Sequence, residues 1–245
     1  MKTFCKSFFI SILLIFVISL FWGCGVNPKQ IKRMQALEEG VSNPTTKEEL
    51  KDAIQKYEHR VEDITSAAAQ TGIWYKILAS RYLDDGMYGE ALKYYQKAIE
   101  YFPINQNLYY WVGVCAGYMA KASLDYNGSG NFSKKENYLK LSESAYLRAL
   151  ELEPTYARAM YGLAILYVFD LNESEKAIPL LEKLLTIDTR NTDAMMVLAN
   201  AYYQNYEFDK AVELYDKIIS ISTSPEKKAA AEANKKLVLE MAYGE

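Results

Sequence analysis

Few side chains in this chain are of the types that carry acid–base catalysis or bind metal ions. His59 is the only histidine, so neither a histidine-based triad nor a histidine metal cluster can be assembled. The acid pairs Glu48-Glu49 and Asp84-Asp85 could in principle exchange protons. At helix starts and in turns, however, such pairs more often favour the helix dipole or solvate a loop. We therefore expect no enzyme, no bound metal and no cofactor.

Cys24 is a candidate for covalent modification, because it ends an apolar N-terminal segment. Two lysines precede an uncharged run over residues 8–22, which is the pattern of a secretory signal. The sequence LFWGC at 20–24 resembles a bacterial lipobox. In a lipobox the cysteine is lipidated and the chain is cut just before it. The resemblance therefore implies a signal peptide over 1–23 and a lipid anchor on Cys24.

The lipobox is similar to the relaxed form of spirochaetes, because Phe21 and Trp22 stand where leucine and a small residue are usual. The alternative is an uncleaved anchor, since residues 8–26 are nearly long enough to cross a bilayer. In both cases we expect the rest of the chain at a membrane of the bacterial envelope, with its folded domain in the periplasm.

The remainder of the chain repeats a pattern of large and small residues. Small residues let the two helices of a hairpin approach closely, and large ones are wedged between successive hairpins. The positions in segment 78–103 resemble a tetratricopeptide repeat of about 34 residues, with two helices, a tight turn and a terminal proline. These positions are Leu78, Ala79, Tyr82, Gly86, Tyr88, Ala91, Tyr95, Ala98 and Pro103.

The pattern recurs, and the resemblance covers about residues 72–223. It implies an all-α, right-handed superhelical solenoid of four repeats with a capping helix at each end. The predicted order is a flexible tether at 24–45, a capping helix at 46–71, repeats at 72–105, 106–156, 157–191 and 192–223, and a capping helix at 224–245. The apolar stripe of the last helix is predicted to be Ala230, Ala233, Leu237 and Met241.

The second repeat is longer than the others. Val112 and Leu163 occupy equivalent positions 51 residues apart, whereas Leu78 and Val112 are 34 apart, an excess of 17 residues. The excess falls between the two helices of this repeat, with the turn at 127–131, so we expect a hairpin of extended helices. The third repeat carries one extra residue, which we expect in its turn near 170–173.

Charge and cysteine content indicate which class of partner to exclude and what role Cys115 has. The formal net charge of −3 comes from well-mixed acids and bases, so we expect no nucleic-acid partner. Once Cys5 leaves with the signal and Cys24 carries a lipid, Cys115 is the only thiol. It falls in an apolar helix, which favours a buried small hydrophobe over a reactive group.

The family usually binds its ligands in a concave groove lined by the first helix of each repeat. Here Lys76, Arg158 and Asn200 are too scattered for the carboxylate clamp of the chaperone-binding members. The remaining wall is aromatic and aliphatic, so we expect a protein or peptide partner with apolar anchors. The predicted groove residues are Lys76, Ser80, Tyr110, Val114, Tyr118, Arg158, Tyr161, Ile165, Phe169, Met196, Asn200 and Tyr203.

Two functions follow from the resemblance. One is a membrane-tethered scaffold in cell-envelope assembly. The alternative is an accessory lipoprotein of a TRAP-type transporter, which would bind a small apolar molecule. The sequence leaves the partner, the membrane and the oligomeric state open.

Overall fold

The computed structural model describes residues 44–125 and 132–244, and every regular element in these ranges is a helix. Cys24, the predicted signal peptide and the predicted turn at 127–131 lie outside the described residues. No helix in the described ranges is both long and apolar enough to cross a membrane. The chain divides into two units, with the boundary between Ser66 and Ala67.

Helix α3 (Lys47–Asp84) begins in the first unit and continues into the second without a break. Its start is fixed by two residues that cap each other, a capping box. The Thr46 hydroxyl accepts from the Glu49 N–H at 3.2 Å, and the Glu49 carboxylate accepts from the N–H groups of Thr45 (2.8 Å) and Thr46 (3.0 Å). The N–H bonds from Thr45 and Thr46 lower the pKa of Glu49. The segment 46–71, predicted as a separate capping helix, is therefore part of one helix with the start of the first repeat.

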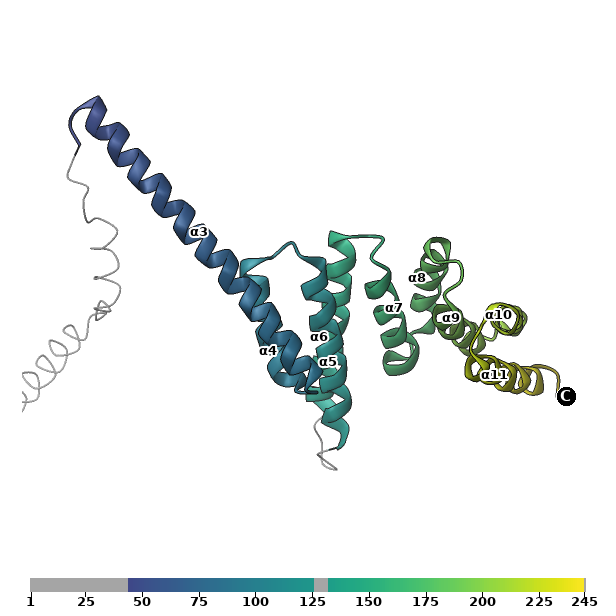
Figure 1. The fold of residues 1–245 in the computed structure, drawn as a ribbon. Coiled ribbons are helices and arrows are strands. Elements are labelled where there is room, and N and C mark those ends of the chain that lie inside the picture. Colours follow the sequence, from purple (N-terminus) through teal and green to yellow (C-terminus); the bar gives the residue numbers. More distant parts are fainter. Residues whose placement is uncertain (1–43, 126–131, 245) are drawn as a thin grey trace, which may run out of the picture. The chain divides into compact units, whose positions relative to one another are not determined.

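The second unit is a succession of helices that pack against their neighbours in the sequence (Figure 1). This arrangement confirms the predicted all-α solenoid. After α3 come α4 (Tyr88–Tyr101), α5 (Gln106–Asp125), α6 (Phe132–Leu152), α7 (Ala157–Ile165), the π-helical segment η1 (Leu166–Leu171), α8 (Ser174–Ile187), α9 (Thr192–Gln204), α10 (Phe208–Ile221) and α11 (Pro225–Tyr243).

Small side chains lie where the two helices of each hairpin approach most closely, as the repeat pattern predicts. All eight of these positions are buried. They allow backbone contact that larger residues would prevent. The positions are Ala79, Ala91, Gly113, Ser142, Ala164, Ala177, Ala199 and Ala211.

The hairpin of the second repeat has the longest helices after α3. Helix α5 has 20 residues and α6 has 21, whereas α4, α8 and α10 have 14 each. The two long helices pack against each other, and their buried contacts extend to Ala120 and Leu139.

The extra residue of the third repeat lies in a helix, and the prediction that it lies in the turn was wrong. Residues Leu166–Leu171 form a π-helical segment at the end of α7. A π-helix absorbs one additional residue within a helical run. The turn that follows stays tight, with Asn172 at φ 55°.

Helix α11 begins as predicted, with Pro225 in its first turn and the Ser224 hydroxyl accepting from the Lys227 N–H at 3.3 Å. Its predicted apolar stripe was wrong by one position. Ala231 and Val238 are the buried residues, whereas the predicted set is exposed. The two sets lie on adjacent faces of one helix, and packing against α10 selects between them. The exposed set is Ala230, Ala233, Leu237 and Met241.

Candidate functional site

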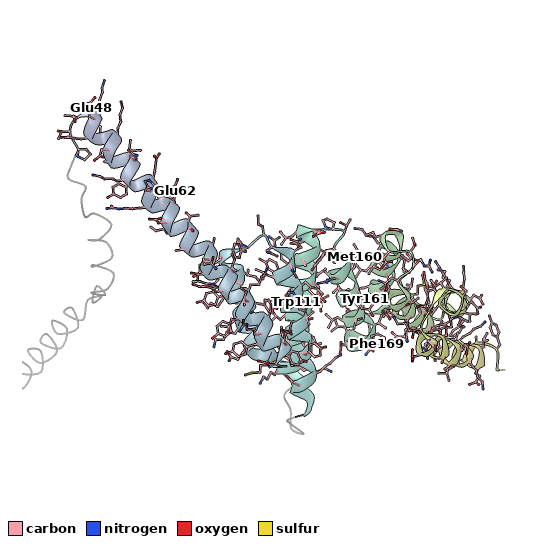
Figure 2. All side chains as sticks on the ribbon, in the orientation of Figure 1. Glu48, Glu62, Trp111, Met160, Tyr161 and Phe169 are labelled. Atoms are coloured by element: carbon pink, nitrogen blue, oxygen red, sulfur yellow. The ribbon has the colours of Figure 1, made fainter. Side chains whose placement is uncertain are left out.

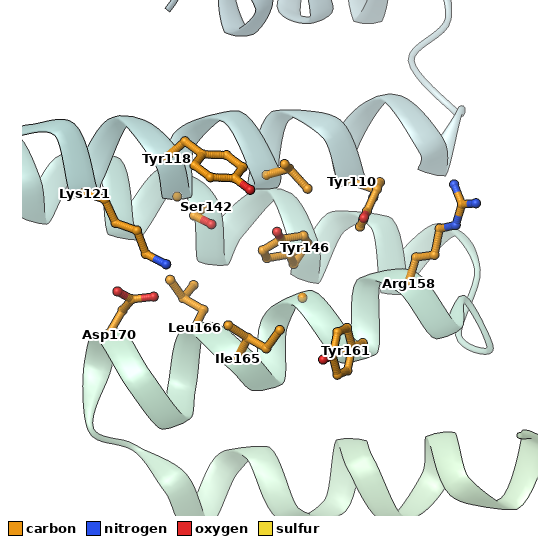
Figure 3. A pocket seen from close by; sticks show the side chains of 13 residues that line it. Tyr110, Tyr118, Lys121, Ser142, Tyr146, Arg158, Tyr161, Ile165, Leu166 and Asp170 are labelled. Atoms are coloured by element: carbon orange, nitrogen blue, oxygen red, sulfur yellow. The ribbon is translucent and has the colours of Figure 1, made fainter. Parts of the chain in front are cut away.

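A cavity of about 310 Å³ opens between α5, α6, α7 and η1 (Figure 3). Its walls come from the first helices of the second and third repeats, where side chains three or four residues apart share one helix face. Helix α6 supplies the floor. The lining residues are Tyr110, Val114, Gly117, Tyr118, Lys121, Ser142, Tyr146, Arg158, Tyr161, Gly162, Ile165, Leu166 and Asp170.

The floor is the ring of Tyr146, which lies between two glycines. A Cβ atom on Gly113 of α5 would lie 2.8 Å from the Cε1 of Tyr146, and one on Gly162 of α7 would lie 2.7 Å from its Cζ. Glycine at both positions therefore lets the ring fit between the helices. Burial raises the pKa of Tyr146, so its hydroxyl stays protonated.

Small residues of the second repeat keep the cavity open beside this ring. The Ser142 hydroxyl is buried and donates a 2.8 Å hydrogen bond to the Gly113 carbonyl. A Cβ atom on Gly117 would lie 3.7 Å from the Ser142 Oγ. This satisfied polar contact joins α6 to α5 beside the cavity.

The walls are aromatic. The ring of Tyr110 meets that of Tyr156 edge-on at 5.8 Å, and Tyr118 stacks on Tyr88 at 4.1 Å. Burial raises the pKa values of Tyr110 and Tyr161, so both phenols remain neutral. Such a surface offers aromatic and aliphatic contacts with a few hydroxyl groups.

Charged groups mark the two ends of the cavity. Lys121 and Asp170 lie across from each other at one end, and Arg158 lies at the other (Figure 3). Within residues 44–125 and 132–244, no carboxylate forms an ion pair with Arg158. Its charge acts against the burial that raises the pKa values of Tyr110 and Tyr156.

The structure brings half of the predicted groove residues together around this cavity. Its remaining lining residues were not predicted, because their role depends on how α6 and η1 pack against the two walls. The six that meet here are Tyr110, Val114, Tyr118, Arg158, Tyr161 and Ile165.

The other predicted residues lie elsewhere. Asn200 and Tyr203 line a second cavity of about 420 Å³ that is formed by residues of α9, α10 and α11. Met196 accepts a weak 3.5 Å hydrogen bond from the Asn234 amide of α11. Phe169 is exposed on η1 and does not line the first cavity.

The last two predicted residues are on α3. The Ser80 hydroxyl is within 3.0 Å of the Tyr95 hydroxyl, so it has an internal partner, and Lys76 is exposed. Lys76, Arg158 and Asn200 thus lie on three separate helices and do not line a common cavity.

The part of the chain that the structure describes contains neither a cluster of metal ligands nor an accessible thiol. No three metal-ligating side chains of the described residues come together. Cys115 is buried, as predicted, and burial raises the pKa of its thiol to about 12.

Comparison with known families and proteins identifies the repeats. Tetratricopeptide-repeat models match residues 78–116, 140–192 and 168–233. A TPR repeat-containing protein of Borreliella burgdorferi is 24% identical over 223 residues, covering 88% of this chain and 93% of that protein.

Solved structures share the fold. The TPR protein TTC0263 of Thermus thermophilus superposes with a TM-score of 0.56 at 19% identity, over 76% of this chain and 93% of that one. MamA of Desulfovibrio magneticus gives 0.53 at 16% identity, over 71% and 97%. Human IFIT1, solved as a dimer with m7Gppp-AAAA, gives 0.59 at 20% identity, over 79% of this chain and 44% of IFIT1.

Proposed function

The chain belongs to the tetratricopeptide-repeat family, and on this premise we propose that it is a membrane-tethered scaffold. Its partner is a protein that inserts an apolar anchor into the cavity between α5, α6 and α7. The observation that carries this proposal is the aromatic and aliphatic lining of that cavity, to which six of the predicted groove residues contribute.

The size of the cavity favours an inserted side chain. Sites for drug-sized molecules occupy roughly 300–1,000 Å³. At about 310 Å³, this cavity is at the lower end of that range. A large apolar side chain of a peptide or helix fills such a space, while the rest of the partner lies along the open groove.

The charges at the ends define the partner further. Arg158 has no carboxylate partner within the described ranges, and it lies at the end of the cavity opposite Lys121 and Asp170. A carboxylate next to the anchor residue of the partner would form an ion pair with the Arg158 guanidinium. We therefore expect an aromatic or aliphatic anchor followed by an acidic residue.

The tether is part of the same proposal. It is supported by the uncharged run at 8–22 and by Cys24 at its end. A lipid on Cys24 would hold the solenoid at a membrane of the cell envelope, where it would assist assembly. Cys24→Ala should leave an unprocessed precursor on an immunoblot, and normal processing of this variant would reject the lipid anchor.

The alternative is an accessory lipoprotein of a TRAP-type transporter. The same aromatic lining supports it, because a small apolar molecule would also bind there. Native mass spectrometry distinguishes the two proposals. A purified chain that carries only a small molecule, with no protein partner, would favour the transporter accessory.

Co-purification from detergent-solubilised envelopes tests the scaffold. The double variant Tyr118→Ala/Tyr161→Ala removes one aromatic ring from each of the two helices that form the cavity walls. Tyr243→Ala is the matched control, because Tyr243 is exposed on α11, away from the cavity lining. We expect a stoichiometric partner with the wild type and the control, and its loss with the double variant. Equal recovery with all three would place the binding site elsewhere.

A further inference from the structure

The first unit carries an apolar seam, which we define as Leu50, Ile54, Tyr57, Val61 and Ile64. Successive members are separated by four and three residues in alternation, which is the spacing of the a and d positions of a heptad. Between 41% (Tyr57) and 61% (Val61) of the surface of each residue is exposed. The seam is thus an exposed apolar line along one side of the helix.

The opposite face of this helix segment is polar. Glu48 and Glu62, labelled in Figure 2, lie on it at equivalent heptad positions. Every other outward position from 48 to 63 is also charged or polar, and Lys56 and Asp52 form an ion pair there at 2.8 Å. The helix is therefore amphipathic, with its apolar residues confined to a narrow line rather than a broad face.

A narrow seam and an acidic balance disfavour a lipid surface as the occupant. Helices that lie on membranes are rich in lysine and arginine on their polar face. Residues 47–66 contain four lysines and arginines against six aspartates and glutamates. This balance is repelled by anionic lipid, whereas the a/d spacing fits a second helix that has the same spacing.

We propose that the seam binds the seam of a second copy of this chain in an antiparallel, two-stranded coiled coil. In one register of this pair, four of the five seam residues face one another: Leu50 packs beside Val61 of the second copy, and Ile54 packs beside Tyr57 of the second copy. Ile54 and Val61 occupy the a positions and Leu50 and Tyr57 the d positions, so each of these contacts joins an a residue of one helix to a d residue of the other. By two-fold symmetry each contact occurs twice.

Charges beside the seam select this arrangement. In the antiparallel register, Lys51 flanks the seam opposite Glu58 of the second copy, and symmetry gives two such pairs. A shift by one heptad in either direction would bring Glu58 onto Glu58 or Lys51 onto Lys51, which is repulsive. A parallel pair would place Glu58 opposite Ala53, with no ion pair.

A charge exchange tests the proposal on the full chain in a density-matched detergent, with sedimentation velocity as the measurement. The wild type should form a concentration-dependent dimer. Glu58→Lys sets lysine against Lys51 twice and should weaken the dimer about tenfold or more. Lys51→Glu should do the same, and the double variant Lys51→Glu/Glu58→Lys should restore the dimer.

Two further variants serve as controls. Val61→Glu places a charge in the seam and should abolish the dimer, whereas Glu62→Lys makes the same charge change as Glu58→Lys on the outer face and should leave the dimer intact. A monomer at all concentrations, or a double variant that does not recover, would overturn the proposal. So would a monomeric chain that binds phosphatidylglycerol vesicles and loses that binding in Val61→Glu.

Discussion

The ring of Tyr146 lies so close to Gly162 that a Cβ atom on this glycine would be 2.7 Å from the Cζ of the tyrosine. The contact joins the second and third repeats at the floor of the aromatic cavity. Gly113 makes the equivalent contact from the other side, at 2.8 Å from Cε1. The cavity therefore depends on two backbone positions that cannot hold a side chain.

Gly162→Ala should destabilise the protein and tilt Tyr146 out of its place. Forcing an extra methyl group into a packed interior costs about 1–3 kcal/mol. Urea unfolding followed by circular dichroism measures this loss of unfolding free energy. Gly89→Ala is the matched control, because its Cβ atom would meet only Met119 at 3.6 Å. Equal free energies of unfolding for the two variants would mean that the close contact between Tyr146 and Gly162 does not matter for stability.

Tyr206→Gly should stabilise the protein. Tyr206 lies in the turn before α10 with φ at 62°, and 81% of its surface is exposed, so the packing of its ring is limited to an edge-on contact with the Phe208 ring at 6.1 Å. The left-handed conformation costs an L-residue roughly 1–2 kcal/mol, which glycine avoids. Thermal melting should show a higher Tm.

The reciprocal variant of this prediction is Gly86→Ala in the first repeat. Gly86 has φ at 72° and no atom within 4 Å of its Cβ position, so only the backbone effect remains. We expect a lower Tm of similar size. A Tyr206→Gly protein that melts below the wild type would mean that the exposed ring contributes more than the strain costs.

The Cys115 thiol should resist alkylation in the folded protein. Burial raises its pKa from 9.0 to about 12, so almost no thiolate is present at pH 8. Iodoacetamide followed by mass spectrometry of the Cys115 peptide should show modification in urea and none in buffer. Rapid native modification would mean that this part of α5 opens readily.

The same thiol makes the protein less stable at alkaline pH. Between pH 9 and about 12 the unfolded chain has released a proton that the folded chain keeps. The free energy of unfolding therefore falls as pH rises through this window. Tyr215, whose pKa burial raises to about 12, acts in the same direction. Cys115→Ala should make the fall with pH shallower.

The repeats could be predicted because small residues recur wherever two helices approach, as at Ala79 and Ala91. The place of the extra residue in the third repeat could not, because the spacing alone allows it in the turn or in the helix. Packing also decided which face of α11 is buried, since Val238 and Leu237 are adjacent and both apolar.

The two walls of the cavity were predictable, because Tyr110 and Tyr161 follow from their positions within a repeat. Its floor was not. The place of Tyr146 in the cavity depends on glycine at Gly113 and Gly162 together. Gly72 in α3 is a further close approach, since its Cβ position is only 2.5 Å from the Phe102 ring. There the glycine allows close packing, and α3 continues through it.

Site-specific photo-crosslinking in cells tests the central proposal most directly. Benzoylphenylalanine in place of Tyr118, on the exposed wall of the cavity, should form a covalent adduct with one defined protein, identified by mass spectrometry. The same group in place of Tyr243 on α11 should not. No adduct at Tyr118, or the same adduct at both positions, would contradict a partner-binding cavity between α5, α6 and α7.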